Sequence, residues 1–208
     1  MHKDSFEGLF CSAVPLVLAS ASPRRKDFLW QLGIDCRVVN PPKTAEPLPH
    51  AGEAPQKYAA RAAKAKADAV YDLLGENNVA VLGADTVVFH GDRVLGKPVD
   101  SAEALIFLQE LAGKDHYVRT ACYLNMGYDK GIPFYGEARV RMGDWPEGVL
   151  RGYAESGEGL DKAGAYAVQG LGAFLVERVS GSWSAVIGLP VAETVAKLLE
   201  HKVIAHRS

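Results

Sequence analysis

Two hydroxyl groups and two guanidinium groups lie close together near the amino end of the sequence, in Ser20-Ala21-Ser22-Pro23-Arg24-Arg25. A short apolar run ends at Ser20 and an amphipathic stretch follows Pro23, which predicts a strand that turns into a helix. Free amides and the helix dipole attract phosphate at such a turn, and arginine can bind phosphate oxygens through two hydrogen bonds. The segment is therefore a candidate phosphate site, although an ordinary helix cap followed by solvated arginines would contain the same residues.

A carboxylate and two lysines follow in positions that suit phosphate chemistry. Asp85 stands at the end of an apolar strand, in Gly83-Ala84-Asp85-Thr86. Ligands of open α/β sheets bind at the carboxyl ends of strands, so Asp85 is well placed to hold a metal ion or to deprotonate a water; a turn-forming role is the alternative. Lys97 occupies the rigid turn Gly96-Lys97-Pro98, and Lys66 lies on a predicted helix. Each lysine, taken alone, is more typical of a surface charge.

A loop rich in small residues, between Glu158 and Gly170, adds acid, base and amide groups in Asp161-Lys162 and Gln169. Glycine lets a backbone approach a ligand closely, but glycines also serve ordinary loops. The combined segments supply cations for a polyphosphate, carboxylates for Mg²⁺ or Mn²⁺, and an amide for a base edge, which is the set that phosphate-ester hydrolysis needs. There is no Walker loop, and the six histidines lack metal-ligand spacing, which argues against a zinc enzyme.

The elements that must position these residues alternate between strand and helix patterns, which predicts a mixed α/β fold with a central sheet flanked by helices. Strands are expected at 16–19, 36–39, 79–83, 86–89, 94–95 and 173–179, with two long antiparallel strands within 117–142. Helices are expected at 23–33, 53–74, 100–113, 145–155 and 190–200. Four prolines between 41 and 49 predict an extended loop and a candidate mobile flap. We expect one catalytic domain over 16–200, between a flexible extension, 1–15, and a C-terminal tail, 201–208.

Bulk properties exclude several classes of protein. The formal net charge of -2 gives no overall attraction to nucleic acid, so affinity for phosphate must come from a local cluster of cations. Three cysteines at irregular spacing, Cys11, Cys36 and Cys122, predict reduced thiols rather than a disulfide framework. No run of about eighteen apolar residues is present, so we expect a cytoplasmic protein that does not bind membranes.

The sequence resembles the Maf nucleotide pyrophosphatases over nearly its whole length, from Leu16 to about Leu199. Seven matching blocks occur in the family's order, and it is their order that makes the resemblance specific. The blocks are Leu18-Ala19-Ser20-Ala21-Ser22-Pro23-Arg24-Arg25, Lys66-Ala67, Gly83-Ala84-Asp85-Thr86, Gly96-Lys97-Pro98, Asp161-Lys162-Ala163-Gly164-Ala165-Tyr166, Gln169-Gly170 and Gly188-Leu189-Pro190. Two departures are Ala45-Glu46, where relatives commonly have Asp-Glu, and Tyr166-Ala167-Val168, where relatives often have Tyr-Gly-Ile.

The resemblance implies two lobes around a nucleotide cleft, an architecture related to inosine triphosphate pyrophosphatases, and a homodimer. It implies that Asp85 is the proton acceptor for the attacking water, and that Asp85 and Glu46 contribute to a site for a divalent cation. The phosphate-binding set that it implies, in which Lys66 and Lys97 are also catalytic, is Ser20, Arg24, Arg25, Lys66 and Lys97. This set agrees with phosphoryl transfer, whose transition state is stabilised by cations and a positioned water.

Three positions of the chain resemble the family's pyrimidine branch. Arg24, Thr86 and Gln169 stand where the 7-methyl-GTP branch typically carries Trp, Gln and Glu, so the resemblance implies hydrolysis of dTTP and UTP, including modified pyrimidine nucleotides, to the monophosphate and pyrophosphate. A glutamine amide can both donate to and accept from a pyrimidine edge. The alternatives are a 7-methyl-GTP or purine pyrophosphatase, and a non-enzymatic factor that arrests cell division.

Overall fold

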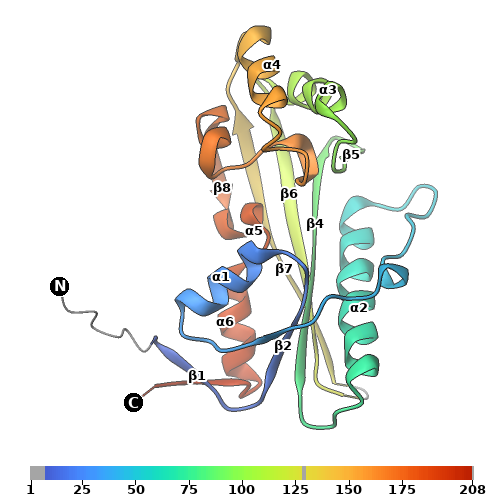
Figure 1. The fold of residues 1–208 in the computed structure, drawn as a ribbon, viewed down its shortest axis with the longest axis vertical. Coiled ribbons are helices and arrows are strands. Elements are labelled where there is room, and N and C mark those ends of the chain that lie inside the picture. The colour runs from blue at the N-terminus through green and yellow to red at the C-terminus, as the bar shows by residue number, and fades with distance from the viewer. Residues whose placement is uncertain (1–7, 128–129, 208) are drawn as a thin grey trace, which may run out of the picture.

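A seven-stranded mixed sheet forms the centre of the computed structural model, which describes residues 8–127 and 130–207 (Figure 1). The strand order is β3-β2-β4-β6-β7-β8, with β5 paired to β4. Strand β2 runs parallel to β3 and β4, whereas the other pairs are antiparallel. The strands are β2 (Leu16–Ala19), β3 (Arg37–Val38), β4 (Ala80–His90), β5 (Arg93–Leu95), β6 (Asp115–Asn125), β7 (Gly131–Met142) and β8 (Val176–Gly181).

Helices cover both faces of this sheet, which confirms the expected fold class (Figure 1). Helix α2 lies along one face, α1 and α6 lie on the other, and α3 and α4 pack near one end of the long strands. The helices are α1 (Pro23–Gln31), α2 (Pro55–Leu74), α3 (Ser101–Leu111), α4 (Glu147–Glu155), α5 (Trp183–Ile187) and α6 (Val191–Glu200), with 3₁₀ segments at Lys43–Ala45, Ala163–Ala165 and Gly170–Leu175. Helix α5 is not predicted from the sequence, because five residues are too few to show a helical period.

Strand β4 carries the central carboxylate and is one continuous strand of eleven residues, although two separate strands are expected from the sequence. It pairs with β2 on one side and with β6 on the other, and nine of its residues are buried. A strand covered on both faces shows no polar alternation, so Asp85 and Thr86 interrupt an apolar run without ending the strand.

Small residues bring helix α2 close to β4. Ala63 and Ala67 are fully buried against the strand, and a Cβ atom added to Gly83 would lie 2.3 Å from the carbonyl oxygen of Ala63. A side chain at position 83 would therefore push the helix away from the sheet. The close approach is what places Lys66 of α2 beside Asp85 of β4.

The two ends of the described chain pair with each other. Strand β1 (Phe10–Ser12) is antiparallel to β9 (Ile204–His206), and Ile204 is buried in the cluster around α1 and α6. These residues belong to the segments that the sequence analysis places outside the domain, and the structure joins them in a two-stranded sheet. Three-residue strands are too short for a periodic pattern to reveal. Residues 1–7 and 208 lie outside the described part of the chain.

Two main hydrophobic clusters stabilise the two ends of the sheet. One contains Leu108 and Met142 beside α3 and α4, and the other contains Leu18 and Leu198 beside α1 and α6. Within residues 8–127 and 130–207, no helix is both long enough and apolar enough to cross a bilayer. All three cysteines are free thiols, as expected.

Candidate active site

A pocket of about 1070 Å³ opens where the turn from β2 to α1, strand β4, helix α2 and the loop 158–170 meet. The structure brings together in its walls all of the residues that the sequence analysis proposes for the site. These residues are Ser20, Arg24, Arg25, Glu46, Lys66, Asp85, Thr86, Lys97 and Gln169. Segments more than a hundred residues apart in the chain thus contribute to one cavity, which is large enough for a nucleotide.

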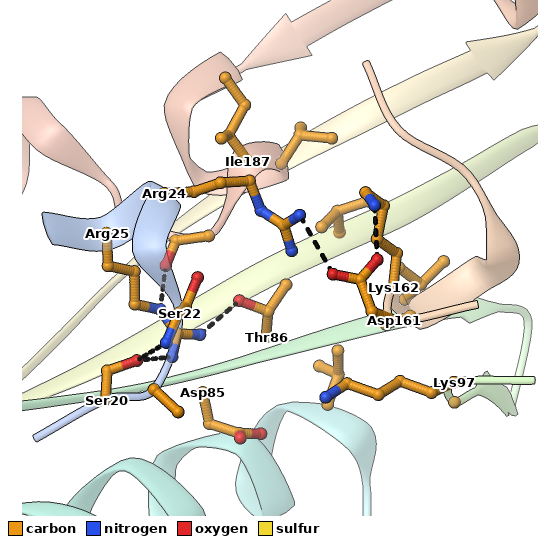
Figure 2. A pocket seen from close by; sticks show the side chains of 18 of the residues that line it. Ser20, Ser22, Arg24, Arg25, Asp85, Thr86, Lys97, Asp161, Lys162 and Ile187 are labelled. Carbon is orange, nitrogen blue, oxygen red and sulfur yellow. Dashed lines mark hydrogen bonds and ion pairs between the residues drawn. The ribbon is translucent and has the colours of Figure 1, made fainter. Parts of the chain in front are cut away.

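Arg25 is fixed by three hydrogen bonds to the protein (Figure 2). Its Nε donates to the carbonyl oxygen of Gly188 at 2.7 Å, and its two terminal nitrogens donate to Ser20 Oγ at 2.8 Å and to Thr86 Oγ1 at 3.1 Å. Burial lowers the pKa of Arg25, against the attraction of Asp85, but a guanidinium remains charged in proteins. A guanidinium has five N–H groups, so two remain for a ligand.

These contacts decide whether the segment from Ser20 to Arg25 is a phosphate site or an ordinary helix cap. Ser22, the residue before α1, makes no side-chain cap hydrogen bond, and Ser20 Oγ accepts instead from the Ser22 amide at 3.1 Å and from Arg25. Arg25 is not a solvated helix residue, because its guanidinium reaches across to β4 and to Gly188. The geometry therefore favours an anion-binding turn at the start of α1 over an ordinary helix cap.

Asp85 forms the acidic centre of the pocket. Its Oδ1 accepts a hydrogen bond from Lys66 Nζ at 2.6 Å, and the two side chains are only 11% and 13% exposed. Burial raises the pKa of Asp85, and the cations Lys66 and Arg25 oppose that shift without cancelling it. Among the described residues Oδ2 has no hydrogen-bond partner, so it can accept a bond from a water. A buried carboxylate with one open oxygen and a raised pKa suits a general base.

The proline-rich loop brings Glu46 to the same place. Glu46 Oε1 lies 3.6 Å from Lys66 Nζ, so the ammonium stands between two carboxylates. Arg61 of α2 anchors the loop by donating to the Leu48 carbonyl at 2.9 Å and to both oxygens of Glu53. Hydrogen bonds from Arg61 and the His50 amide lower the pKa of Glu53 to about 2. The hydrogen bonds of Arg61 thus hold the expected extended loop against α2.

Two further cations face the pocket and make few hydrogen bonds or ion pairs with the described residues. Lys97 makes no hydrogen bond or ion pair with any residue in the described part of the chain, and its side chain extends toward Asp85 (Figure 2). Arg24 lies 3.6 Å from Asp161, which is itself 2.5 Å from Lys162. An exposed pair at that distance contributes little stability, so Arg24 can exchange Asp161 for an anionic ligand.

Glu158 fixes the loop that carries Gln169. Its carboxylate accepts from the Leu171 amide at 2.9 Å, from the Gly172 amide at 2.7 Å and from the Tyr153 hydroxyl at 3.0 Å. Burial would raise the pKa of Glu158, but these hydrogen bonds outweigh burial and lower it. Gln169 itself is exposed on the pocket wall, with its side-chain amide open to a ligand. The amino-acid sequence places Glu158 in the small-residue loop, but no pattern around it predicts this role.

Replacing Glu158 with Gln should loosen this loop, because an amide nitrogen cannot accept from the N–H groups that the carboxylate binds. Loss of one or two such bonds predicts a rise of roughly threefold to tenfold in KM for the nucleotide substrate that the resemblance implies, with a smaller change in kcat. Steady-state kinetics would measure both. Glu155→Gln, an exposed change on the preceding helix, is the matched control. An unchanged KM in Glu158→Gln would show that the loop does not depend on this carboxylate.

Comparison with known proteins shows to which family this chain belongs. The profile of the Maf family, described as Maf-like protein, matches residues 15–201. The chain belongs to the Maf family. The dTTP/UTP pyrophosphatase of Nitratidesulfovibrio vulgaris is 46% identical, over 95% of this chain and 92% of that protein. The dTTP/UTP pyrophosphatase of Lawsonia intracellularis is 36% identical, over 98% of this chain and 91% of that protein.

One solved structure shows partial similarity to this Maf chain. A HAM1 protein from Coxiella burnetii superposes with a TM-score of 0.43 and 16% identity, over 64% of this chain and 75% of that chain.

A divalent cation fits the acidic groups of this Maf pocket only if the substrate supplies ligands. No group of three His, Cys, Asp or Glu side chains that could hold a metal is present within residues 8–127 and 130–207. Glu46 and Asp85 nevertheless lie near each other, because both contact the ammonium of Lys66. Mg²⁺ is commonly bound by one or two carboxylates together with waters and substrate phosphates. The two carboxylates suit that mode of binding, and they do not suit a closed protein site.

The structure also identifies site residues of this Maf chain that sequence analysis does not single out. Thr120 of β6 is fully buried beside Thr86, and Tyr153 of α4 donates to Glu158 and accepts from the Ala167 amide at 3.1 Å. The sequence pattern could have indicated Thr120, because it is a polar residue among apolar neighbours on the inward face of an alternating strand. Tyr153 gave no comparable signal, since a tyrosine on an amphipathic helix is usually a core residue.

Proposed function

We propose that this Maf protein hydrolyses nucleoside triphosphates to the monophosphate and pyrophosphate, with dTTP and UTP as its substrates. The observation that carries the proposal is the convergence of Asp85 with Arg25, Lys66 and Lys97 in one pocket. A base surrounded by cations serves the attack of water on a polyphosphate. The preference for pyrimidines rests on the printed activity of the relatives, together with Arg24, Thr86 and Gln169 in the pocket wall.

The positions of these groups support the following reaction. Water bound at Oδ2 of Asp85 attacks a phosphorus atom, and Asp85 takes its proton as the P–O bond to the leaving pyrophosphate breaks. Arg25 and Lys97 stabilise the negative charge that develops on the phosphate oxygens, and the hydrogen bonds of Arg25 orient its guanidinium before the reaction. Lys66 holds Asp85 in place through Oδ1, which leaves Oδ2 for the water. The proton then passes from Asp85 to solvent when the products leave.

A divalent cation, Mg²⁺ or Mn²⁺, is part of this proposal. Asp85 and Glu46 would hold it, and the cation would neutralise charge on the triphosphate. We also propose a cytoplasmic homodimer that binds no nucleic acid. The net charge of -2 supports the last point, because it provides no general attraction to a phosphate backbone.

A substrate panel tests the proposed function. Pyrophosphate release should be measured for dTTP, UTP, CTP, GTP and 7-methyl-GTP, each with Mg²⁺ and with Mn²⁺. We expect the highest kcat/KM for dTTP and UTP. A preference for 7-methyl-GTP or GTP would refute the pyrimidine assignment and leave the pyrophosphatase assignment in place. Absence of hydrolysis with every nucleotide would refute the enzyme and favour the non-enzymatic factor.

Replacing Gln169 with Glu should lower activity toward pyrimidines. Glutamine donates and accepts hydrogen bonds, whereas a carboxylate of the same size only accepts. A polar group left unpaired against the base costs about 1 to 3 kcal/mol, so we expect roughly a 10- to 100-fold fall in kcat/KM for dTTP and UTP. Gln56→Glu, on the first turn of α2 and outside the pocket lining, is the matched control. Equal kcat/KM in wild type and Gln169→Glu would exclude base recognition by this amide.

A further inference from the structure

Thr120 lies at the junction of two hydrogen-bonded routes to Arg25. It is fully buried on β6, directly opposite Thr86 of β4 in the antiparallel register. Its Oγ1 is 2.6 Å from the Ala185 carbonyl oxygen and 2.8 Å from Thr86 Oγ1. Thr120 does not line the pocket and has no access to a nucleotide.

The direction of these hydrogen bonds is determined by chemistry. A carbonyl oxygen can only accept, so the single hydroxyl proton of Thr120 is donated to Ala185. Thr120 must then accept from Thr86, whose own proton is used in that bond. Thr86 Oγ1 is left with a lone pair, and the N–H of Arg25 donates to it at 3.1 Å. Thr86 therefore presents an acceptor, and no donor, toward the pocket.

The second route passes through the turn after α5. The Ala185 carbonyl, which Thr120 binds, also accepts from the Gly188 amide at 3.1 Å. The Gly188 carbonyl in turn accepts from Arg25 Nε at 2.7 Å. Gly188 has a φ of 125°, a conformation that residues with side chains rarely adopt. Because glycine can adopt many other conformations as well, neighbouring hydrogen bonds must keep this carbonyl aimed at Arg25.

We infer that Thr120 is a positioning residue for Arg25: one buried hydroxyl orders both Thr86 Oγ1 and the Ala185–Gly188 turn, and so aims the free N–H groups of Arg25 at the ligand's phosphates. The inference rests on the proposed function, in which Arg25 binds the polyphosphate. Loss of the Thr120 hydroxyl leaves Thr86 free to rotate and removes one of the bonds that hold the turn. The guanidinium then stays in the pocket with a less defined orientation.

The test compares Thr120→Val, which keeps the shape of the side chain and removes the hydroxyl, with Thr120→Ser, which keeps the hydroxyl. We expect kcat/KM for dTTP to fall about tenfold in Thr120→Val, and to stay within about threefold of wild type in Thr120→Ser. Thr194→Val is the matched control, because Thr194 is equally buried on α6 and its Oγ1 has no hydrogen-bond partner within residues 8–127 and 130–207. Thermal unfolding of each variant ensures that rates are compared on folded protein.

A second measurement separates positioning from a general effect on packing. Arg25→Lys removes the guanidinium at which both hydrogen-bonded routes end. In that background Thr120→Val should therefore change kcat/KM by less than about twofold. The same tenfold loss in that background would overturn the inference, as would wild-type activity of Thr120→Val on its own.

Binding of inorganic pyrophosphate, measured by calorimetry, keeps the inference separate from the proposed function. If the wild type hydrolyses no triphosphate, the proposed function fails, and the dissociation constant for pyrophosphate then decides the role of Thr120. Several-fold weaker binding by Thr120→Val, with binding by Thr120→Ser close to wild type, would support the inference. Equal binding by wild type and Thr120→Val, or no binding by the wild type, would overturn it.

Discussion

Asp85→Asn should reduce kcat by about 10²- to 10⁴-fold while the protein remains folded, because an amide cannot take the proton of the attacking water. The change keeps the size of the side chain and an oxygen for Lys66 Nζ, which lies 2.6 Å from Oδ1 in the wild type. Binding of the nucleotide should change much less than turnover. The measurement is kcat for dTTP with circular dichroism as a check on folding, and Asp92→Asn in the exposed turn after β4 is the control.

The pH dependence of the wild type gives a second view of Asp85. Burial raises the pKa of this carboxyl above its ordinary value of 3.8, with Lys66 and Arg25 opposing the shift. The base must be deprotonated to act, so kcat/KM should be constant at higher pH and fall as the pH drops through the raised pKa. The acidic fall should be absent from the residual activity of Asp85→Asn. Near-normal turnover in that variant would exclude Asp85 as the base.

The sequence is sufficient to predict which residues form the site, but it does not predict the hydrogen bonds that join them. Seven ordered blocks indicate the family, and every block contributes at least one residue to the lining of one pocket. Strand β4 shows the limit, because a polar pair within an apolar run looks like a strand end when the covering layers are unknown. The partners of Arg25 show the same limit. Gly188 lies 163 residues away from Arg25, and no local pattern reports a contact at that separation.

Contacts within a single element or turn are easier to predict than contacts across the sheet. Asp100 caps α3 by accepting from the Glu103 amide at 2.9 Å, which the spacing of the two acids predicts directly. Thr120 and Tyr153 act on the pocket through other residues. The role of Tyr153 depends on how the loop 158–170 folds back against α4, and that of Thr120 depends on which strands are neighbours. The strand order of the sheet supplies that information, and the amino-acid sequence alone does not.

Arg25→Lys should lower kcat/KM by about 10²- to 10³-fold, although it preserves the positive charge. The guanidinium binds Gly188, Ser20 and Thr86 with three N–H groups and still has two for the ligand. An ammonium has three donors on one atom, so it cannot satisfy these three acceptors and also contact phosphate. Steady-state kinetics with dTTP would measure the loss, with Arg151→Lys on the exposed surface of α4 as the control.

The neighbouring arginine makes this prediction specific. Arg24 lies 3.6 Å from Asp161 in a loose ion pair, and its side chain is 33% exposed. Lysine can replace a charge held in that way, so Arg24→Lys should cost no more than about tenfold. If the site used both arginines only as positive charge, the two lysine variants would lose activity equally. Equal losses, or activity of Arg25→Lys within about threefold of wild type, would therefore show that the three hydrogen bonds of Arg25 do not contribute to catalysis.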